Sequence, residues 1–338
     1  MTTPTTAGSI PPRRRPRRRT VLIGVLGLLI AALPGLRWLS IALWQFEDAP
    51  RLTATQTQLA NGRAPVAQSP LDGDLTLSKF EYSIHGTRLN VIHHTHDRTP
   101  RPTLVMINGG AWRVEDEDRD LWYAEGWARH GYTVVTIAHR PSDTAPFPGP
   151  TEDILAGVDF ALSLAGYGID GDRLAFFGGS SGAHLATYTA YRLHETHPDA
   201  TVRAVVSVFG PTDFGTIADD ARGNTWYRIA TLAYTPDLDE TADINRFLGC
   251  NLLRRDCRDQ MVAASPITYV SSRSPATMIV QGKQDDTVPW RQAIRLADAL
   301  ADVDRPFELV LDPDMDHRLD PDHLEAITVF LDTHLEAG

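Results

Sequence analysis

The chain has 338 residues, of which 42% are hydrophobic and 22% charged, and this make-up is typical of a globular protein with a sizeable core. Its formal net charge is −11, yet residues 1–37 contain seven arginines and no acidic residue. Removing those seven positive charges leaves −18 on residues 38–338. We therefore expect no nucleic-acid partner, because phosphate binding needs a basic surface.

The N-terminal segment combines a basic run with an apolar run. Residues 1–20 are rich in Thr, Pro and Arg, which predicts a basic disordered tail. An uncharged stretch begins at Val21 and is followed by Trp38 and Trp44, which suit a membrane interface. The pattern predicts a transmembrane signal-anchor over residues 21–44. The positive-inside rule then leaves the tail in the cytoplasm and the rest of the chain on the other side of the cell membrane.

Two alternatives to an anchor stay open. Basic residues before an apolar run are also typical of a cleaved signal peptide, and Arg18-Arg19 resembles the start of a twin-arginine signal. No A-x-A cleavage site follows the apolar run, which favours an uncleaved anchor. A buried soluble helix is disfavoured by the six arginines directly upstream.

The sequence predicts a polar connector over residues 45–78 and a catalytic domain over residues 79–338. The domain opens with an expected antiparallel hairpin, Phe80–Ile84 with Arg88–His93, at the edge of a sheet. Apolar runs then alternate with amphipathic stretches, which predicts a mainly parallel twisted sheet with helices on both faces. The expected strands are 103–108, 133–139, 173–177, 202–208, 276–281 and 307–311, and the expected helices are 118–130, 151–166, 181–195, 290–302 and 321–335. Residues 211–262 break this rhythm and are expected to form an insertion over an active site.

A strand–turn–helix pattern surrounds Gly178-Gly-Ser-Ser-Gly182. A G-x-S-x-G sequence placed between a strand and a helix is typical of a nucleophile elbow. The turn is so tight that Gly178 and Gly182 must lack bulk. Ser180 would then lie at a helix N-terminus, where backbone N–H groups favour developing negative charge.

The insertion contains the only two cysteines of the chain, Cys250 and Cys257. In an oxidising compartment, two cysteines this close in sequence predict a local disulfide. Two separate thiols are the alternative, because sequence does not show whether the geometry permits a bridge. A zinc site is disfavoured, since no histidine cluster lies at a suitable spacing.

A serine nucleophile needs a base that is held by a third group, and the expected chain order is Ser, acid, His. Asp285 and Asp286 follow an expected strand, and Asp285 is the favoured acid. His317 lies in the loop before the last expected helix. It is therefore predicted to act as general base and then as general acid.

Three other features of the sequence resemble binding or catalytic sites. The acidic loop before His317 has calcium-loop spacing but lacks the required Gly and terminal Glu. A metal site at His93, His94 and His96 is a weaker hypothesis than a strand end. His184 is expected to have a packing role.

Acyl transfer also needs N–H donors for the oxyanion of the tetrahedral intermediate. Ser181 follows the nucleophile, and Gly110 and Ala111 lie in a glycine-containing loop after the strand 103–108. The backbone N–H groups of these three residues are the predicted oxyanion hole. Five aromatic residues are candidates for pocket walls, with a place in the core as the equal alternative: Trp112, Trp122, Trp226, Tyr227 and Trp290.

Five motifs together resemble the carboxylesterase/lipase branch of the α/β-hydrolases, including the hormone-sensitive-lipase-like, feruloyl-esterase-like and kynurenine-formamidase-like enzymes. They are Asn108-Gly-Gly-Ala-Trp112, Gly168-Ile-Asp-Gly-Asp-Arg173, Gly178-Gly-Ser-Ser-Gly-Ala-His-Leu-Ala186, Ala264-Ser-Pro-Ile-Thr-Tyr-Val270 and Gln281-Gly-x-x-Asp-x-x-Val-Pro289. The resemblance covers residues 80–335. The last motif assigns the acidic position to Asp285. Asn108 and Gln281 stand where the family has histidine, and Ser181 where it has alanine.

The resemblance implies a serine hydrolase that cleaves carboxylic esters without a metal or organic cofactor. Together with the N-terminal segment it predicts a membrane-anchored esterase or lipase that acts on a small-molecule or lipid ester. An acyltransferase, an amidase or formamidase, and a non-catalytic binding protein on the same fold are the alternatives.

Overall fold

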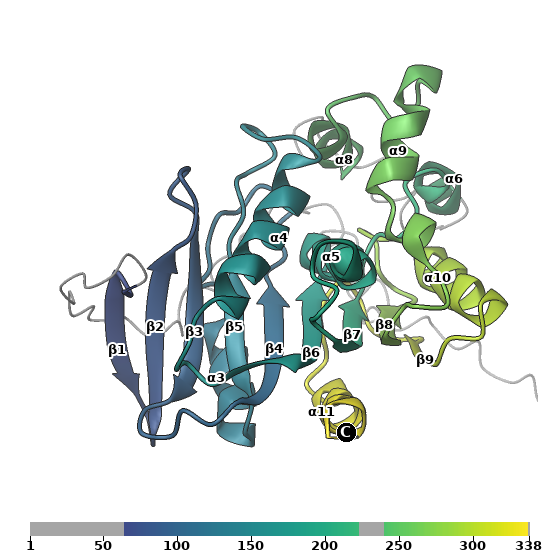
Figure 1. Ribbon diagram of the computed structural model, residues 1–338. Helices are drawn as coiled ribbons and strands as arrows, with labels where there is room; N and C mark the ends of the chain where they lie inside the picture. The colour runs from purple at the N-terminus through teal and green to yellow at the C-terminus, as the bar shows by residue number, and fades with distance from the viewer. Residues whose placement is uncertain (1–63, 223–239, 337–338) are drawn as a thin grey trace, which may run out of the picture. The chain divides into compact units, whose positions relative to one another are not determined.

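A computed structural model describes residues 64–222 and 240–336 (Figure 1). Within these residues a nine-stranded sheet has the order β1-β2-β3-β5-β4-β6-β7-β8-β9. The strands are β1 (Ala67–Leu71), β2 (Leu75–Glu81), β3 (Arg88–His94), β4 (Arg101–Ile107), β5 (Thr133–Ile137), β6 (Ile169–Gly179), β7 (Val202–Val208), β8 (Ala276–Gly282) and β9 (Phe307–Asp312). Strands β4 to β9 pair in parallel with one another. Strands β1, β2 and β3 pair antiparallel with one another, and β3 joins β5 antiparallel. The mainly parallel sheet is thus confirmed, and β2 and β3 form the expected antiparallel hairpin, although β1 and not this hairpin forms the edge of the sheet.

The folded domain starts earlier than expected. Strand β1 and most of β2 lie inside residues 45–78, which were predicted to be a polar connector. Leu75 and Leu77 of β2 belong to the core on one side of the sheet and Phe80 to the core on the other side, because neighbouring residues of a strand point to opposite faces. Polar residues separate these buried side chains, so β2 has no continuous apolar run, which explains the error.

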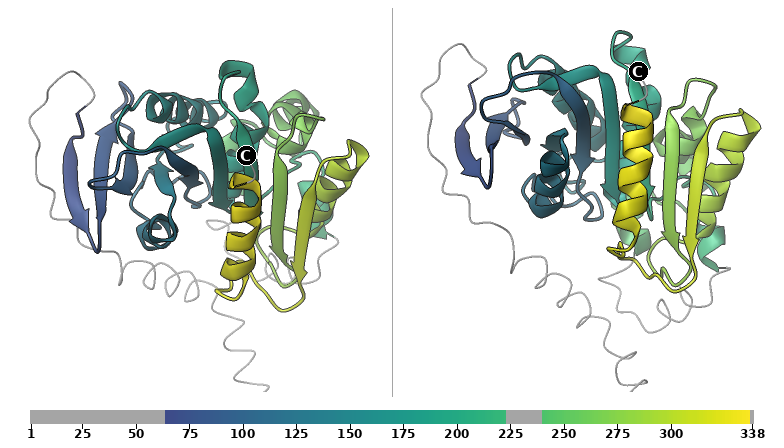
Figure 2. Two further views of the ribbon diagram at one scale, coloured as in Figure 1. Left: turned by 60° about the horizontal axis from the view of Figure 1, so that its bottom comes forward. Right: turned by 90° about the horizontal axis from the view of Figure 1, so that it is seen from below.

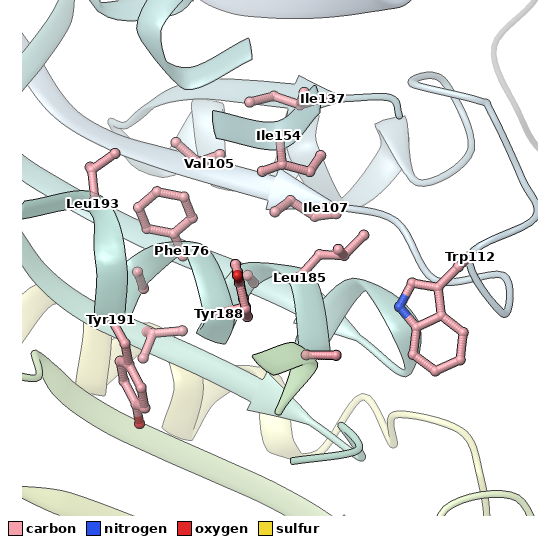
Figure 3. Close-up of a cluster of buried hydrophobic side chains, with 14 of the residues drawn as sticks. Val105, Ile107, Trp112, Ile137, Ile154, Phe176, Leu185, Tyr188, Tyr191 and Leu193 are labelled. Carbon is pink, nitrogen blue, oxygen red and sulfur yellow. The ribbon is translucent and has the colours of Figure 1, made fainter. Parts of the chain in front are cut away.

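Helices cover both faces of the sheet, as expected (Figures 1 and 2). One face packs against α4 (Gly149–Leu162), α5 (Ser181–Thr196) and α10 (Arg291–Asp302), and the other against α3 (Leu121–His130) and α11 (His323–Leu335). Neighbouring residues of β4 point to opposite faces: Val105 and Ile107 belong to the first core, and Leu104 and Met106 to the second. Figure 3 shows part of the first core.

The expected insertion lies between β7 and β8. Its described part consists of α6 (Ile217–Arg222), α8 (Glu240–Leu248), a 3₁₀ turn η2 (Arg255–Cys257), α9 (Arg258–Ala264) and a second 3₁₀ turn η3 (Pro266–Tyr269). Apolar residues of α6, α8 and α9 join the same core as α4, α5 and α10. The predicted disulfide is present: Cys250 and Cys257 are bonded, with their Cα atoms 5.6 Å apart.

The N-terminal tail and the expected membrane segment, residues 1–20 and 21–44, lie outside the described residues. Among the helices of residues 64–222 and 240–336, none has the length and apolar character that a membrane crossing requires.

Candidate active site

Ser180 occupies a sharp turn between β6 and α5. Its backbone is in an unusual conformation, with φ 57° and ψ −127°, and such a conformation persists only where the surroundings enforce it. A Cβ on Gly178 would lie 2.4 Å from the backbone of Gly182, and a Cβ on Gly182 would lie 2.1 Å from the carbonyl oxygen of Ile107. Both positions therefore exclude any side chain, as the tight turn predicted.

The turn places the Ser180 hydroxyl next to His317. The His317 Nε2 atom lies 3.0 Å from Ser180 Oγ, and His317 Nδ1 lies 2.8 Å from Asp285 Oδ2. A carboxylate only accepts hydrogen bonds, so Nδ1 donates to Asp285 and Nε2 is left to accept the serine proton. The structure thus brings together three residues that are far apart in the chain, each from a loop that follows β6, β8 or β9.

Asp285 is held by its own loop. It is completely buried, at 0% exposure. Its Oδ1 atom accepts hydrogen bonds from the backbone N–H groups of Thr287 and Val288, at 2.9 and 2.8 Å. Gln281, which stands where the family has histidine, donates from Nε2 to Asp285 Oδ2 at 2.9 Å. These contacts fix the carboxylate toward His317, in agreement with the choice of Asp285 over Asp286.

The environment of His317 determines its proton affinity. Burial lowers the pKa of this imidazole, but the charge of Asp285 and the hydrogen bond to it outweigh that effect and raise the pKa above 6.5. The ring of Phe209 packs against His317 with centroids 4.4 Å apart. A base held between a carboxylate and a serine hydroxyl is the arrangement that nucleophilic catalysis requires.

The predicted oxyanion loop lies against this turn. A Cβ on Gly109 would be 2.7 Å from the carbonyl oxygen of Gly179 and 3.4 Å from Ser180 Cβ. Within residues 64–222 and 240–336, the N–H groups of Gly110 and Ala111 have no hydrogen-bond partner. Ser181 is the first residue of α5, and such N–H groups have no partner inside their own helix. The loop thus approaches the nucleophile at Gly109, and the next two residues have N–H groups that make no hydrogen bond within the described residues.

Several other sequence-based hypotheses can be compared with the structure. Trp112 was a candidate pocket wall, yet only 4% of it is exposed and its ring is enclosed by core residues. Trp112 therefore belongs to the core, which was the other alternative, because the loop turns its ring inward. Trp122 is largely exposed on α3 and Trp290 is half-buried before α10, while Trp226 and Tyr227 lie outside the described residues.

Two histidines considered in the sequence, His93 and His184, are engaged in the fold. His93 hydrogen-bonds Ser78 through Nε2 and the carbonyl of His94 through Nδ1. The residues described in the structure contain no group of three His, Cys, Asp or Glu side chains placed to hold a metal ion. His184 is fully buried in α5, in line with the packing role expected for it.

Three side chains at the site were missed from sequence. Phe209 packs on His317, Gln281 donates to Asp285, and Arg119 donates from Nη1 to the carbonyl of Gly109 at 3.2 Å. Phe209 directly follows β7, and residues at the carboxyl ends of parallel strands face the ligand side of such sheets. That position could have indicated Phe209, whereas nothing in the sequence around Arg119 indicates its contact.

Comparison with known proteins identifies the family. The family model described as BD-FAE matches residues 89–300, which include Ser180 and Asp285. The chain belongs to the BD-FAE family. This is an esterase family of the α/β-hydrolase fold, and its match to this chain ends before His317.

The chain is also similar to individual proteins of known name. The chain is 26% identical to the esterase LipQ of Mycobacterium tuberculosis over 211 residues, which are 60% of this chain and 46% of LipQ. It is 25% identical to the mouse (Mus musculus) acylamino-acid-releasing enzyme over 265 residues, 71% of this chain and 32% of that enzyme. The chain thus spans less than half the length of these two relatives.

A solved structure supports the fold. The truncated form of a carbohydrate esterase from gut microbiota superposes with a TM-score of 0.64 at 20% identity. The superposition covers 79% of this chain and 99% of that one.

Proposed function

We propose that the chain is a carboxylic-ester hydrolase that works through an acyl-enzyme on Ser180. The observation that carries this proposal is the hydrogen-bonded series from Ser180 Oγ through His317 to Asp285. Membership of an esterase family supports the same reaction class.

The first half of the reaction forms the acyl-enzyme. His317 Nε2 takes the proton of Ser180 as Oγ attacks the ester carbonyl carbon, and Asp285 stabilises the imidazolium that results. The carbonyl oxygen gains negative charge and accepts hydrogen bonds from the backbone N–H groups of Gly110, Ala111 and Ser181. The tetrahedral intermediate then collapses, the bond to the alcohol oxygen breaks, and His317 returns the proton to the departing alcohol.

The second half releases the acid. His317 removes a proton from water, whose oxygen attacks the acyl carbon and forms a second tetrahedral intermediate. The bond to Ser180 Oγ breaks, and Oγ regains its proton from His317. An acceptor alcohol in place of water would make the same enzyme an acyltransferase.

A second candidate activity is amide cleavage, because acylamino-acid-releasing enzymes are among the relatives. The same groups serve both reactions, and the leaving group alone differs. The kcat/KM values for a 4-nitrophenyl ester and for the anilide of the same acyl group decide between them. An ester preference of many orders of magnitude is expected for an esterase, and comparable values would instead support an amidase.

Ester hydrolysis itself is tested with a series of 4-nitrophenyl esters of increasing acyl length on the full-length chain. Release of nitrophenolate that depends on Ser180 supports the proposal and ranks small against lipid-like acyl groups. Wild-type protein that turns over none of the esters would contradict it.

We further propose that residues 21–44 anchor the chain in the cell membrane, with the arginine-rich tail in the cytoplasm. The basic run before an uncharged stretch supports this orientation. The disulfide between Cys250 and Cys257 also supports it, because such bonds persist in oxidising compartments.

A further inference from the structure

The oxyanion loop has an unusual backbone that requires an explanation. Gly110, Ala111 and Trp112 follow one another with φ values of 140°, 55° and 57°. A positive φ costs a residue with a side chain about 1 kcal/mol or more. Two of the three residues carry side chains, so contacts elsewhere must hold the loop in this form.

Trp112 makes those contacts. Its indole Nε1–H donates to His184 Nδ1 at 3.1 Å, and its ring stacks on Phe247 of α8, with centroids 4.5 Å apart and planes 17° apart. Its carbonyl oxygen accepts the N–H of Ser142 at 2.7 Å. Figure 3 shows Trp112 at the end of the core cluster, beyond Leu185 of α5.

The partner of Trp112 has a defined protonation state. An indole N–H can only donate, so His184 Nδ1 is the acceptor and the imidazole proton lies on Nε2. That proton is donated to the carbonyl of Ala264 at 2.8 Å. Burial lowers the pKa of His184 to about 4, and the ring is 0% exposed. His184 is therefore neutral, and both its nitrogens are occupied, so it neither moves protons nor touches substrate.

His184 also contacts the nucleophile's own backbone. It lies one helical turn after Ser180, and its N–H donates to the Ser180 carbonyl at 3.1 Å. The backbone of His184 thus contacts the nucleophile elbow, while its side chain contacts the oxyanion loop.

We infer that His184 is a positioning residue that, through Trp112, holds the N–H groups of Gly110 and Ala111 in register with Ser180. The inference rests on the proposed ester hydrolysis and concerns the oxyanion donors of that reaction. Displaced donors would stabilise the transition state less while leaving ground-state binding nearly unchanged, so kcat should fall and KM should not. A displacement of this kind can lower kcat on the order of ten- to a hundredfold.

The test uses variants of the full-length protein that keep one of the two side-chain hydrogen bonds of His184 and remove the other. In His184→Asn the amide oxygen takes the place of Nδ1 and can still accept from Trp112, whereas His184→Gln restores only the Nε2 donor. Trp112→Phe keeps the stacking on Phe247 and removes the N–H. We expect His184→Asn to retain most of the wild-type kcat, and the other two variants to lose ten- to a hundredfold with KM unchanged.

Two further measurements distinguish positioning from plain stability. A boronic acid that forms a tetrahedral adduct on Ser180 should bind more weakly in parallel with the loss of kcat. Tyr191→Phe is the matched control, because it removes another buried hydrogen bond of α5, to Thr277, away from the loop. It should lower stability to urea but leave kcat unchanged.

A double variant, Trp112→Phe with His184→Gln, should lose no more kcat than either single variant, because both remove one bond. Additive losses, equal kcat in His184→Asn and His184→Gln, or a loss confined to stability would each overturn the inference. A wild-type chain without Ser180-dependent esterase activity would instead contradict the proposed function.

Discussion

At the scale of single residues, the negative charge of Asp285 governs when His317 can act as a base. Its carboxylate raises the imidazole pKa above 6.5, and a protonated imidazole cannot accept the Ser180 proton. The acidic limb of kcat/KM should therefore lie above pH 6.5, with activity falling as pH decreases through the raised pKa. A pH profile with a 4-nitrophenyl ester measures this limb directly.

Removing the negative charge of Asp285 should shift the acidic limb of the pH profile. Asp285→Asn should shift it to lower pH, since the main interaction that raises the pKa of His317 is lost, and should reduce kcat by about 10⁴. Asp286 also raises the pKa of His317, but more weakly than Asp285, so Asp286→Asn should give a small shift in the same direction and little loss of rate. A larger loss of activity in Asp286→Asn than in Asp285→Asn would show that the wrong carboxylate had been assigned.

Sequence reasoning reached Ser180 and Asp285 because each lies in a recognisable motif after an apolar strand, and it reached His317 from the chain order Ser, acid, His and its place in the loop before the last helix. It could not reach the contacts of Trp112, since its positive φ and its bond to His184 depend on how α5 and α8 pack. Tertiary packing also placed Arg119 beside Gly109. Such side chains act through contacts between distant segments, which spacing along the chain does not show.

At the scale of elements, the packing of α5 against β4 explains the glycine that follows the nucleophile by two residues. Gly182→Ala would place a Cβ 2.1 Å from the Ile107 carbonyl oxygen, which is backbone and cannot rotate away. The free energy of unfolding should fall by about 3 kcal/mol, as measured by urea denaturation, and esterase activity should fall with it.

Gly179→Ala is the matched control within the same turn. Its Cβ would meet only the Phe209 ring, at 3.2 Å, a side chain that can shift by a few tenths of an ångström. A loss of less than about 1 kcal/mol is expected. Equal destabilisation in the two variants would contradict the close approach of α5 to β4.

The disulfide closes a short loop between α8 and α9. Replacing Cys250 and Cys257 together by serine should lower the free energy of unfolding by about 2 kcal/mol, the order expected when a loop of this length is no longer closed in the unfolded chain. Urea denaturation of the variant and of the wild-type protein with and without reductant measures the effect. Insensitivity of the wild-type protein to reductant would contradict a stabilising bond.

Strands were predicted well where their sequences are continuous apolar runs, as in Ala276–Gly282, whose residues are all buried. The strands β1 and β2 were missed or shortened because they alternate with polar residues at the edge of the sheet. The insertion was recognised only as a break in the pattern. Its helices are short, and the packing of Phe247 of α8 on Trp112 joins segments that are far apart in the chain.

At the scale of the whole molecule, the proposed anchor makes a topological prediction. A reporter fused after Gly338 should be active only outside the cytoplasm, because the arginines at positions 13–19 keep the N-terminus inside. A carbonate wash should leave the full-length chain in the membrane fraction. A soluble form that starts near residues 38–48 would instead indicate a cleaved signal.

The central claim is that Ser180 becomes acylated. The most direct measurement treats the full-length protein with a fluorophosphonate and locates the adduct by peptide mass spectrometry, alongside Ser180→Ala and Ser181→Ala. We expect one adduct, on Ser180. Both the adduct and ester hydrolysis should be absent from Ser180→Ala, and both should be fully retained in Ser181→Ala because only the backbone of Ser181 is used. Ester hydrolysis that persists in Ser180→Ala, or an adduct on another residue that accounts for the activity, would contradict it.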